Sequence, residues 1–142
     1  PGVAYTLQRV RKGKAEDIHL PNRHERYGPF VLGLCSSAVV LVVLPMIGAS
    51  GHMIAFSRFT ALISFLLTVI TFRWKISVHS TVIGGAVVLV AGIFGLKAAL
   101  VLSPLVPLVG IARVALGRHT LAQVLAGTML GLTTSALILT RR

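Results

Sequence analysis

Long apolar runs are the feature that most limits what this chain can fold into. A helix of about 20 apolar residues crosses the hydrocarbon core of a bilayer, which is roughly 30 Å thick, at 1.5 Å per residue. The stretch 80–112 carries one charge, Lys97, and is too long for a single crossing, so we divide it there. The sequence therefore predicts an all-α fold, a multispan transmembrane helical bundle with about five membrane helices. The predicted spans are residues 30–49, 53–72, 80–96, 98–112 and 120–140.

The composition excludes a soluble domain. Hydrophobic residues make up 55% of the chain, charged residues make up 12%, and the mean hydropathy is +0.89. The 14 Lys and Arg residues outnumber the 3 Asp and Glu residues and give a net charge of +11. In a soluble protein this charge would indicate a nucleic-acid partner, but here most basic residues flank the apolar runs. We therefore predict membrane lipids as partners, anionic lipid in particular, and no nucleic acid.

Two regions follow from the distribution of charge along the chain. Residues 1–29 are polar and basic and are interrupted by Pro21, Gly28 and Pro29, whereas residues 30–142 contain the predicted spans. With five crossings, the basic segment and both polar junctions described below lie on one side of the membrane. That side then carries ten of the 14 Lys and Arg residues. The positive-inside rule predicts that it is cytoplasmic, in a multi-pass protein of the cell membrane.

A basic turn lies between the last two predicted spans. It contains Arg113, Gly117, Arg118 and His119, and so places two guanidinium groups and an imidazole where two membrane helices meet. Ionisable groups are costly at such a place. Arginine pairs with phosphate through a planar fork of donors, and histidine changes its protonation near neutral pH. Together they predict the handling of a phosphate ester at a membrane surface. The alternative is that the arginines are interfacial anchors and His119 is a polar helix start.

Gln123 has two predicted roles. Thr120 and Gln123 have the spacing of a capping box, in which two side chains bind the first amides of a helix. Gln123 also lies one helical turn after His119, so it could hydrogen-bond the imidazole and set its tautomer. The sequence does not separate these roles. Arg118, next to His119, is either a phosphate ligand or a surface anchor, and we favour the anchor.

A second polar junction lies between the second and third predicted spans. Lys75, Ser77 and His79 stand at the start of a helix there, where unpaired N–H groups and the helix dipole favour an anion. Ser77 could donate a hydrogen bond to phosphate, Lys75 could add charge, and His79 could donate a proton. A helix cap with a snorkelling lysine explains Ser77 and Lys75 well, but it explains His79 poorly.

The residues of the basic turn resemble a signature of the type 2 phosphatidic acid phosphatase superfamily. The third signature of that family reads Ser-Arg, five residues, His, three residues, Asp. In this chain Ala112 and Arg113 are followed after five residues by His119 and after three more by Gln123. The spacing matches, with Ala in place of Ser and Gln in place of Asp.

The other two signatures are matched less fully. The second, Pro-Ser-Gly-His, is similar to Ile-Ser-Val-His at residues 76–79. The first, Lys, six residues, Arg-Pro, has no clean match, and Arg23 and Arg26 are the candidates for its basic residues. The resemblance covers about residues 17–140. Because the family usually has six spans, we expect that one N-terminal helix is missing from this sequence.

The resemblance implies an integral membrane phosphatase that hydrolyses lipid phosphate monoesters or polyprenyl phosphates and diphosphates without a metal or another cofactor. His119 would be the nucleophile that forms a phosphohistidine. His79 would be the acid that protonates the leaving alcohol, and Gln123 would take the place of the family's carboxylate. The candidate phosphate-binding residues are Arg113, Ser77, Lys75, Arg23 and Arg26.

Two other functions stay open at this point. The neutral amide of Gln123 favours a catalytically degenerate relative that binds anionic lipid headgroups. Arg58 is a charge inside the second predicted span and would suit a small transporter subunit, although its side chain could also extend to the membrane surface.

The spacing of Gly127 and Gly131 predicts close helix packing, with dimerisation as the weaker alternative. The sequence indicates no particular oligomeric state.

Overall fold

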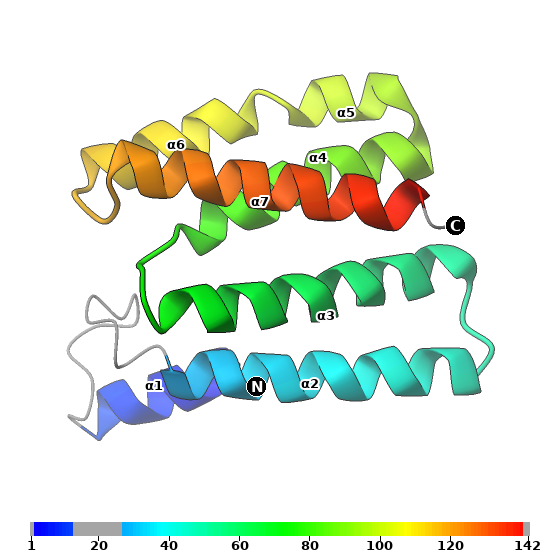
Figure 1. Ribbon diagram of the computed structural model, residues 1–142, viewed down its shortest axis with the longest axis horizontal. Coiled ribbons are helices and arrows are strands. Elements are labelled where there is room, and N and C mark those ends of the chain that lie inside the picture. Colours follow the sequence, from blue (N-terminus) through cyan, green and yellow to red (C-terminus); the bar gives the residue numbers. More distant parts are fainter. Residues whose placement is uncertain (1, 13–26, 141–142) are drawn as a thin grey trace.

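The regular structure of the protein is helical. The computed structural model describes residues 2–12 and 27–140 and has the arrangement that Figure 1 shows. The helices are α1 (Gly2–Arg11), α2 (Tyr27–Met46), α3 (Gly51–Thr71), α4 (Val78–Phe94), α5 (Leu96–Leu102), α6 (Leu105–Ala115) and α7 (Leu121–Thr140). The predicted all-α fold is therefore confirmed for the described residues.

Four stretches of the described chain are long and apolar enough to cross a membrane. They are α2, α3, the combined stretch Leu96–Ala115 and α7, with 20 or 21 residues each. Helix α4 is also apolar but has 17 residues. These helices confirm the predicted multispan transmembrane bundle, and each begins and ends within a few residues of a predicted span.

The first span ends earlier than predicted because the chain makes a tight turn after α2. Gly48 has φ +68°, a conformation that favours glycine. The amide of Ala49 donates to the carbonyl of Leu44 over 3.0 Å, and the amide of Gly48 donates to the carbonyl of Pro45 over 3.1 Å. These two bonds satisfy carbonyls that the helix end leaves open. The helix therefore stops at Met46 and not at residue 49.

The fourth predicted span is longer than expected and is broken. The sequence predicts one helix over residues 98–112, whereas the structure has α5 and α6 over Leu96–Ala115 with a break at Ser103 and Pro104. Pro104 lacks the N–H that would continue the helix of α5. Pro107 lies in the first turn of α6, where amide groups have no acceptor within the helix.

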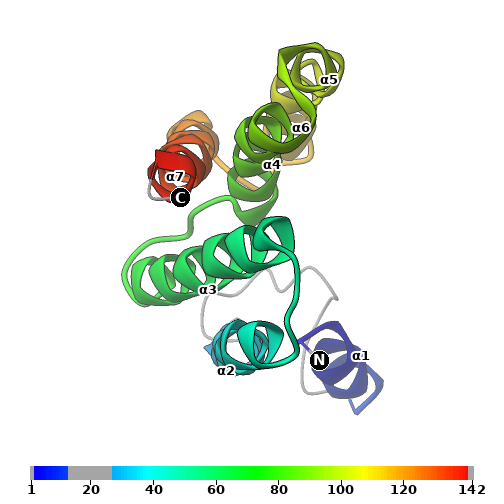
Figure 2. The same cartoon turned by 90° about the vertical axis from the view of Figure 1, so that its right-hand side faces the viewer.

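Helix α3 lies in the middle of the bundle. Figure 2 shows it between α2 on one side and α4 to α7 on the other. Its buried apolar residues recur every four positions and are 3 to 4% exposed, namely Ala55, Phe59, Ile63 and Leu67. They form one apolar core with Ile76, Leu89 and Ile138. Helix α2, by contrast, buries one residue, Ser37, so most of its apolar surface faces outward, as expected for contact with lipid.

Helices α4 and α7 run side by side in the same direction and approach each other closely. The residues in contact are small and recur every four positions, Ser77, Thr81 and Gly85 against Gly127, Gly131 and Ser135. A Cβ added at Gly127 would lie 2.6 Å from the carbonyl oxygen of Ser77. The Ser135 hydroxyl donates to the carbonyl of Gly85 over 3.0 Å. The predicted packing role of these glycines is confirmed, and it operates within one chain.

This packing places both polar junctions at one end of the bundle. The chain enters α4 and α7 at the same end, where α3 and α6 finish (Figure 1). The amide of Ser77, at the start of α4, donates to the carbonyl of Gln123, in the first turn of α7, over 3.3 Å. The two junctions therefore meet through the main chain. We call this end of the bundle the basic end, since Arg73, Lys75, Arg113 and Arg118 all lie there.

Candidate functional site

The imidazole of His119 is held by the first turn of α7. His119 is 7% exposed, and its Nδ1 lies 3.0 Å from Oε1 of Gln123. The same Oε1 accepts the amide of Thr120 over 3.2 Å, and the amide of Gln123 donates to the hydroxyl of Thr120 over 3.3 Å. The capping box is therefore confirmed. Gln123 fills both predicted roles with a single oxygen atom.

These contacts determine the tautomer of His119. A backbone amide can only donate, so the side-chain atom of Gln123 that meets Thr120 must be the oxygen. An amide oxygen can only accept, so Nδ1 of His119 must carry the hydrogen of the bond between them. In the neutral imidazole the lone pair then lies on Nε2. Nε2 is the atom that could act as a nucleophile or a base.

The turn before His119 is compact. Gly117 has φ +62°, and the amides of Arg118 and His119 both donate to the carbonyl of Arg113, over 3.1 and 3.2 Å. This closes the end of α6 and directs the chain into α7. A side chain at residue 117 would be strained in this conformation. The turn thus brings the main chain of His119 to Arg113, although six positions separate them.

The guanidinium of Arg113 is half-buried at this turn. Its Nε is buried and has no hydrogen-bond acceptor among the described residues. The positive charge of Arg118 acts on it unfavourably. A buried donor without a partner is costly, and two like charges add to that cost. An anion placed between the two arginines would relieve both.

Ser77 acts as the N-cap of α4. It is 0% exposed, its Oγ lies 2.9 Å from Oγ of Ser80, and it accepts the amide of Ser80 over 3.4 Å. Of the two roles that the sequence left open, the structure has the cap. Ser77 would have to give up this cap to bind phosphate. Its backbone contact with Gln123 makes it part of the support beneath His119.

His79 faces away from α7. Because successive helix residues are about 100° apart, residue 79 lies roughly 200° around α4 from Ser77, whose side of the helix packs against α7. His79 is exposed and lines an open apolar groove of about 350 Å³ with Val78, Val82 and Ile83 of α4 and Val109 of α6. Among the described residues His119 does not line this groove.

Arg113 lies on α6 between the groove of His79 and the turn of His119, whose amide its carbonyl accepts. It follows Val109 by four residues, one turn further along the same face of α6. Arg113 is not among the described residues that line the groove. His79 is on α4, Arg113 is on α6, and His119 is in the turn before α7, all at the basic end of the bundle.

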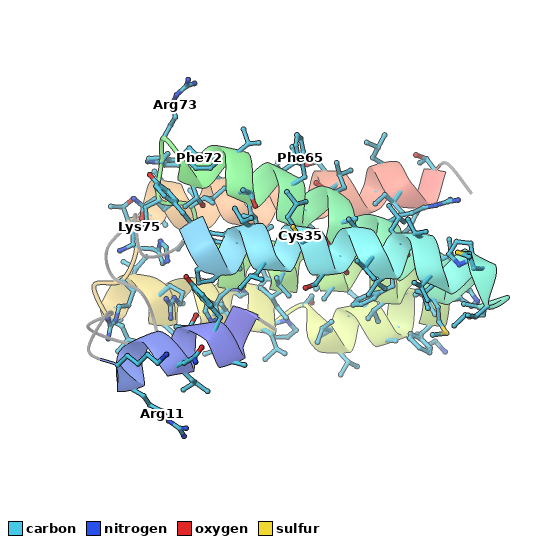
Figure 3. All side chains as sticks on the ribbon, turned by 90° about the horizontal axis from the view of Figure 1, so that it is seen from below. Arg11, Cys35, Phe65, Phe72, Arg73 and Lys75 are labelled. Atoms are coloured by element: carbon cyan, nitrogen blue, oxygen red, sulfur yellow. The ribbon has the colours of Figure 1, made fainter. Side chains whose placement is uncertain are left out.

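The other predicted site residues contribute less to this geometry. Lys75 and Arg118 are half-buried at the basic end, and Figure 3 shows Arg73 pointing away from the bundle near them. Arg23 and Arg26 lie outside the described residues.

The sequence did not predict Thr71, whose buried hydroxyl has no partner within the described chain. No pattern in an apolar helix marks such a residue. Three or more potential metal ligands do not cluster anywhere in residues 2–12 and 27–140.

Comparison with known proteins gives no relative to which this site could be compared. No protein-family model, curated protein or solved structure matches the chain.

Proposed function

We propose that the protein is an integral membrane phosphatase that hydrolyses lipid phosphate monoesters or polyprenyl phosphates at the basic end of its bundle. One observation carries the proposal. Gln123 holds His119 in the tautomer whose lone pair lies on Nε2, and the main-chain amide of His119 donates to the carbonyl of Arg113, whose buried guanidinium Nε has no acceptor among the described residues. A positioned imidazole next to a phosphate-binding cation is what attack on a phosphoryl group requires. The charge of this end supports a cytoplasmic location.

In the proposed reaction Nε2 of His119 attacks phosphorus. A nitrogen–phosphorus bond forms, the bond from phosphorus to the alcohol oxygen breaks, and a proton passes from His79 to the leaving alcohol through solvent water, because the His79 ring faces the groove and not α7. Water then attacks the phosphorus of the phosphohistidine, the nitrogen–phosphorus bond breaks, and the proton that the water loses returns to His79. Inorganic phosphate leaves, and the neutral imidazole of His119 is restored. Arg113 stabilises the charge on the transferring group. The apolar groove beside His79 would take the first part of the hydrocarbon chain.

Substitution of Arg113 tests the phosphate contact. In vesicles that contain phosphatidic acid, the Arg113→Gln protein should release phosphate with a kcat/KM lowered by about 10²-fold, because one cation that stabilises the transition state is lost. Arg73→Gln is the matched control, since it removes the same charge from the same end on a side chain that points away from the bundle. An equal loss of kcat/KM in both variants would mean that the surface charge of this end, and not a contact with Arg113, attracts the substrate.

Substitution of Gln123 tests the tautomer. Gln123→Ala removes the acceptor of Nδ1 and should lower kcat by about 10²-fold. Gln123→Glu offers oxygens to the same two donors and adds a negative charge that stabilises the imidazolium, so kcat should rise by about tenfold over the unaltered protein. If glutamate and alanine lower kcat to the same extent, orientation of His119 by this side chain is not what limits the reaction.

A second function is favoured by the neutral side chain of Gln123 and by the buried hydroxyl of Ser77. A site without a carboxylate to stabilise the imidazolium could bind anionic lipid headgroups and never release phosphate. Under this alternative the purified protein would bind phosphatidic acid, Arg113→Gln would weaken binding, and no inorganic phosphate would appear. The phosphate-release assay on the unaltered protein separates the two functions.

A further inference from the structure

A second cationic pocket lies at the other end of the bundle. Arg58 and His52 of α3 line an open pocket of about 390 Å³ together with Gly51, Ile54 and Ala55. Its size is within the range of small-molecule sites, about 300 to 1,000 Å³. Helix α3 begins here and ends at the basic end, so the pocket is separated from His119 by the length of a membrane span (Figure 1).

Arg58 is a charge inside an apolar helix. It lies seven residues after Gly51, the first residue of α3, which places it about 10 Å along the helix axis from that end. A guanidinium at this depth is costly in a membrane unless it finds a partner. Its long side chain can extend towards the helix start, and it shares the pocket with His52 in this way.

The chain has no side-chain carboxylate near Arg58 in sequence. The three carboxylates are Glu16, Asp17 and Glu25, so helices α2 to α7 contain none. Within the described residues Arg58 has no hydrogen bond or ion pair. The charge of Arg58 must therefore be balanced from outside these helices. The anions nearest to the end of a membrane helix, towards which the Arg58 side chain can extend, are the phosphates of lipids.

We propose that this pocket binds the phosphate group of an anionic phospholipid from the leaflet at that end of the bundle. The Arg58 guanidinium can form two parallel hydrogen bonds with phosphate oxygens. His52 adds a second polar group to the wall, and the half-buried Ile54 offers an apolar surface to the glycerol and upper acyl chain. This lipid site is separate from the proposed phosphatase site and does not depend on it.

Lipid titration followed by native mass spectrometry tests the proposal. Phosphatidylglycerol is titrated into the detergent-purified full chain, with phosphatidylcholine of the same acyl chains as the reference lipid. Arg58→Leu should raise the Kd for phosphatidylglycerol by about fivefold, because one near-surface charge contact is lost, and should leave phosphatidylcholine binding unchanged. Leucine suits an apolar helix, so the variant should fold.

Lys97→Leu is the matched control. Lys97 lies near the start of α5, at the same end as the pocket, and does not line it. Its loss should leave the Kd for phosphatidylglycerol unchanged. The proposal is overturned if Arg58→Leu binds the lipid as well as the unaltered protein does, or if Lys97→Leu weakens binding equally. Displacement of the lipid by an equal concentration of inorganic phosphate would overturn the assignment to a phospholipid.

Discussion

His119→Ala should reduce phosphate release from phosphatidic acid by about 10⁴-fold or more, because loss of a nucleophile removes the covalent step altogether. The structure also predicts which nitrogen atom of His119 carries the phosphoryl group. Since Nδ1 of His119 donates to Gln123, the phosphoryl group must attach to Nε2. Brief reaction of the unaltered protein with labelled substrate, followed by nuclear magnetic resonance of the isolated peptide, should identify a phosphohistidine substituted at that nitrogen.

Binding of a phosphonate analogue separates a lost nucleophile from a damaged site. The analogue cannot be hydrolysed, and its main contact is expected to be Arg113, so its Kd should change little in His119→Ala. An unchanged Kd with no phosphate release would place the defect in the chemical step. Phosphate release that survives in His119→Ala would remove the proposed mechanism. A phosphohistidine substituted at Nδ1 would contradict the tautomer that the hydrogen bonds indicate.

The fold was predictable because apolar length and helix-ending residues are local properties of the sequence. The predicted spans and the helices agree to within a few residues, and the differences have local causes. Pro104 divides the fourth span, and the turn at Gly48 ends the first one early. The pattern of apolar residues cannot place such an end, because the turn depends on one glycine in a left-handed conformation.

The candidate site was predictable only in part, because side-chain direction depends on how helices are rotated against one another. Two predicted spans lie between His79 and His119, and this even number of crossings correctly places their turns at one end of the bundle. It does not say which way each ring faces. The contact of Ser77 and Thr81 with α7 rotates α4 so that His79 faces α6. The positions of His119, Thr120 and Gln123 in the sequence also could not show that one oxygen of Gln123 accepts from both the imidazole and the amide of Thr120.

The close approach of α4 and α7 is what aligns the candidate site, and Gly131→Ala should therefore disturb both stability and function. A Cβ at Gly131 would overlap the carbonyl oxygen of Thr81 and lie 2.7 Å from the amide nitrogen of Gly85, both of which are main-chain atoms that cannot turn aside. The helices would have to separate, at a cost of about 3 kcal/mol in the free energy of unfolding. Unfolding in mixed detergent micelles measures this change.

Gly33→Ala provides the control for this substitution, because Gly33 lies inside α2 with no atom within 4 Å of the position of an added Cβ. Alanine favours a helix by about 1 kcal/mol over glycine, so this variant should be as stable as the unaltered protein or more so. Separation of α4 from α7 would also strain the bond from Ser77 to Gln123 that supports the first turn of α7. Gly131→Ala should accordingly lose phosphate release even at temperatures where it stays folded. Equal stability of the two alanine variants would mean that these glycines do not set the distance between the helices.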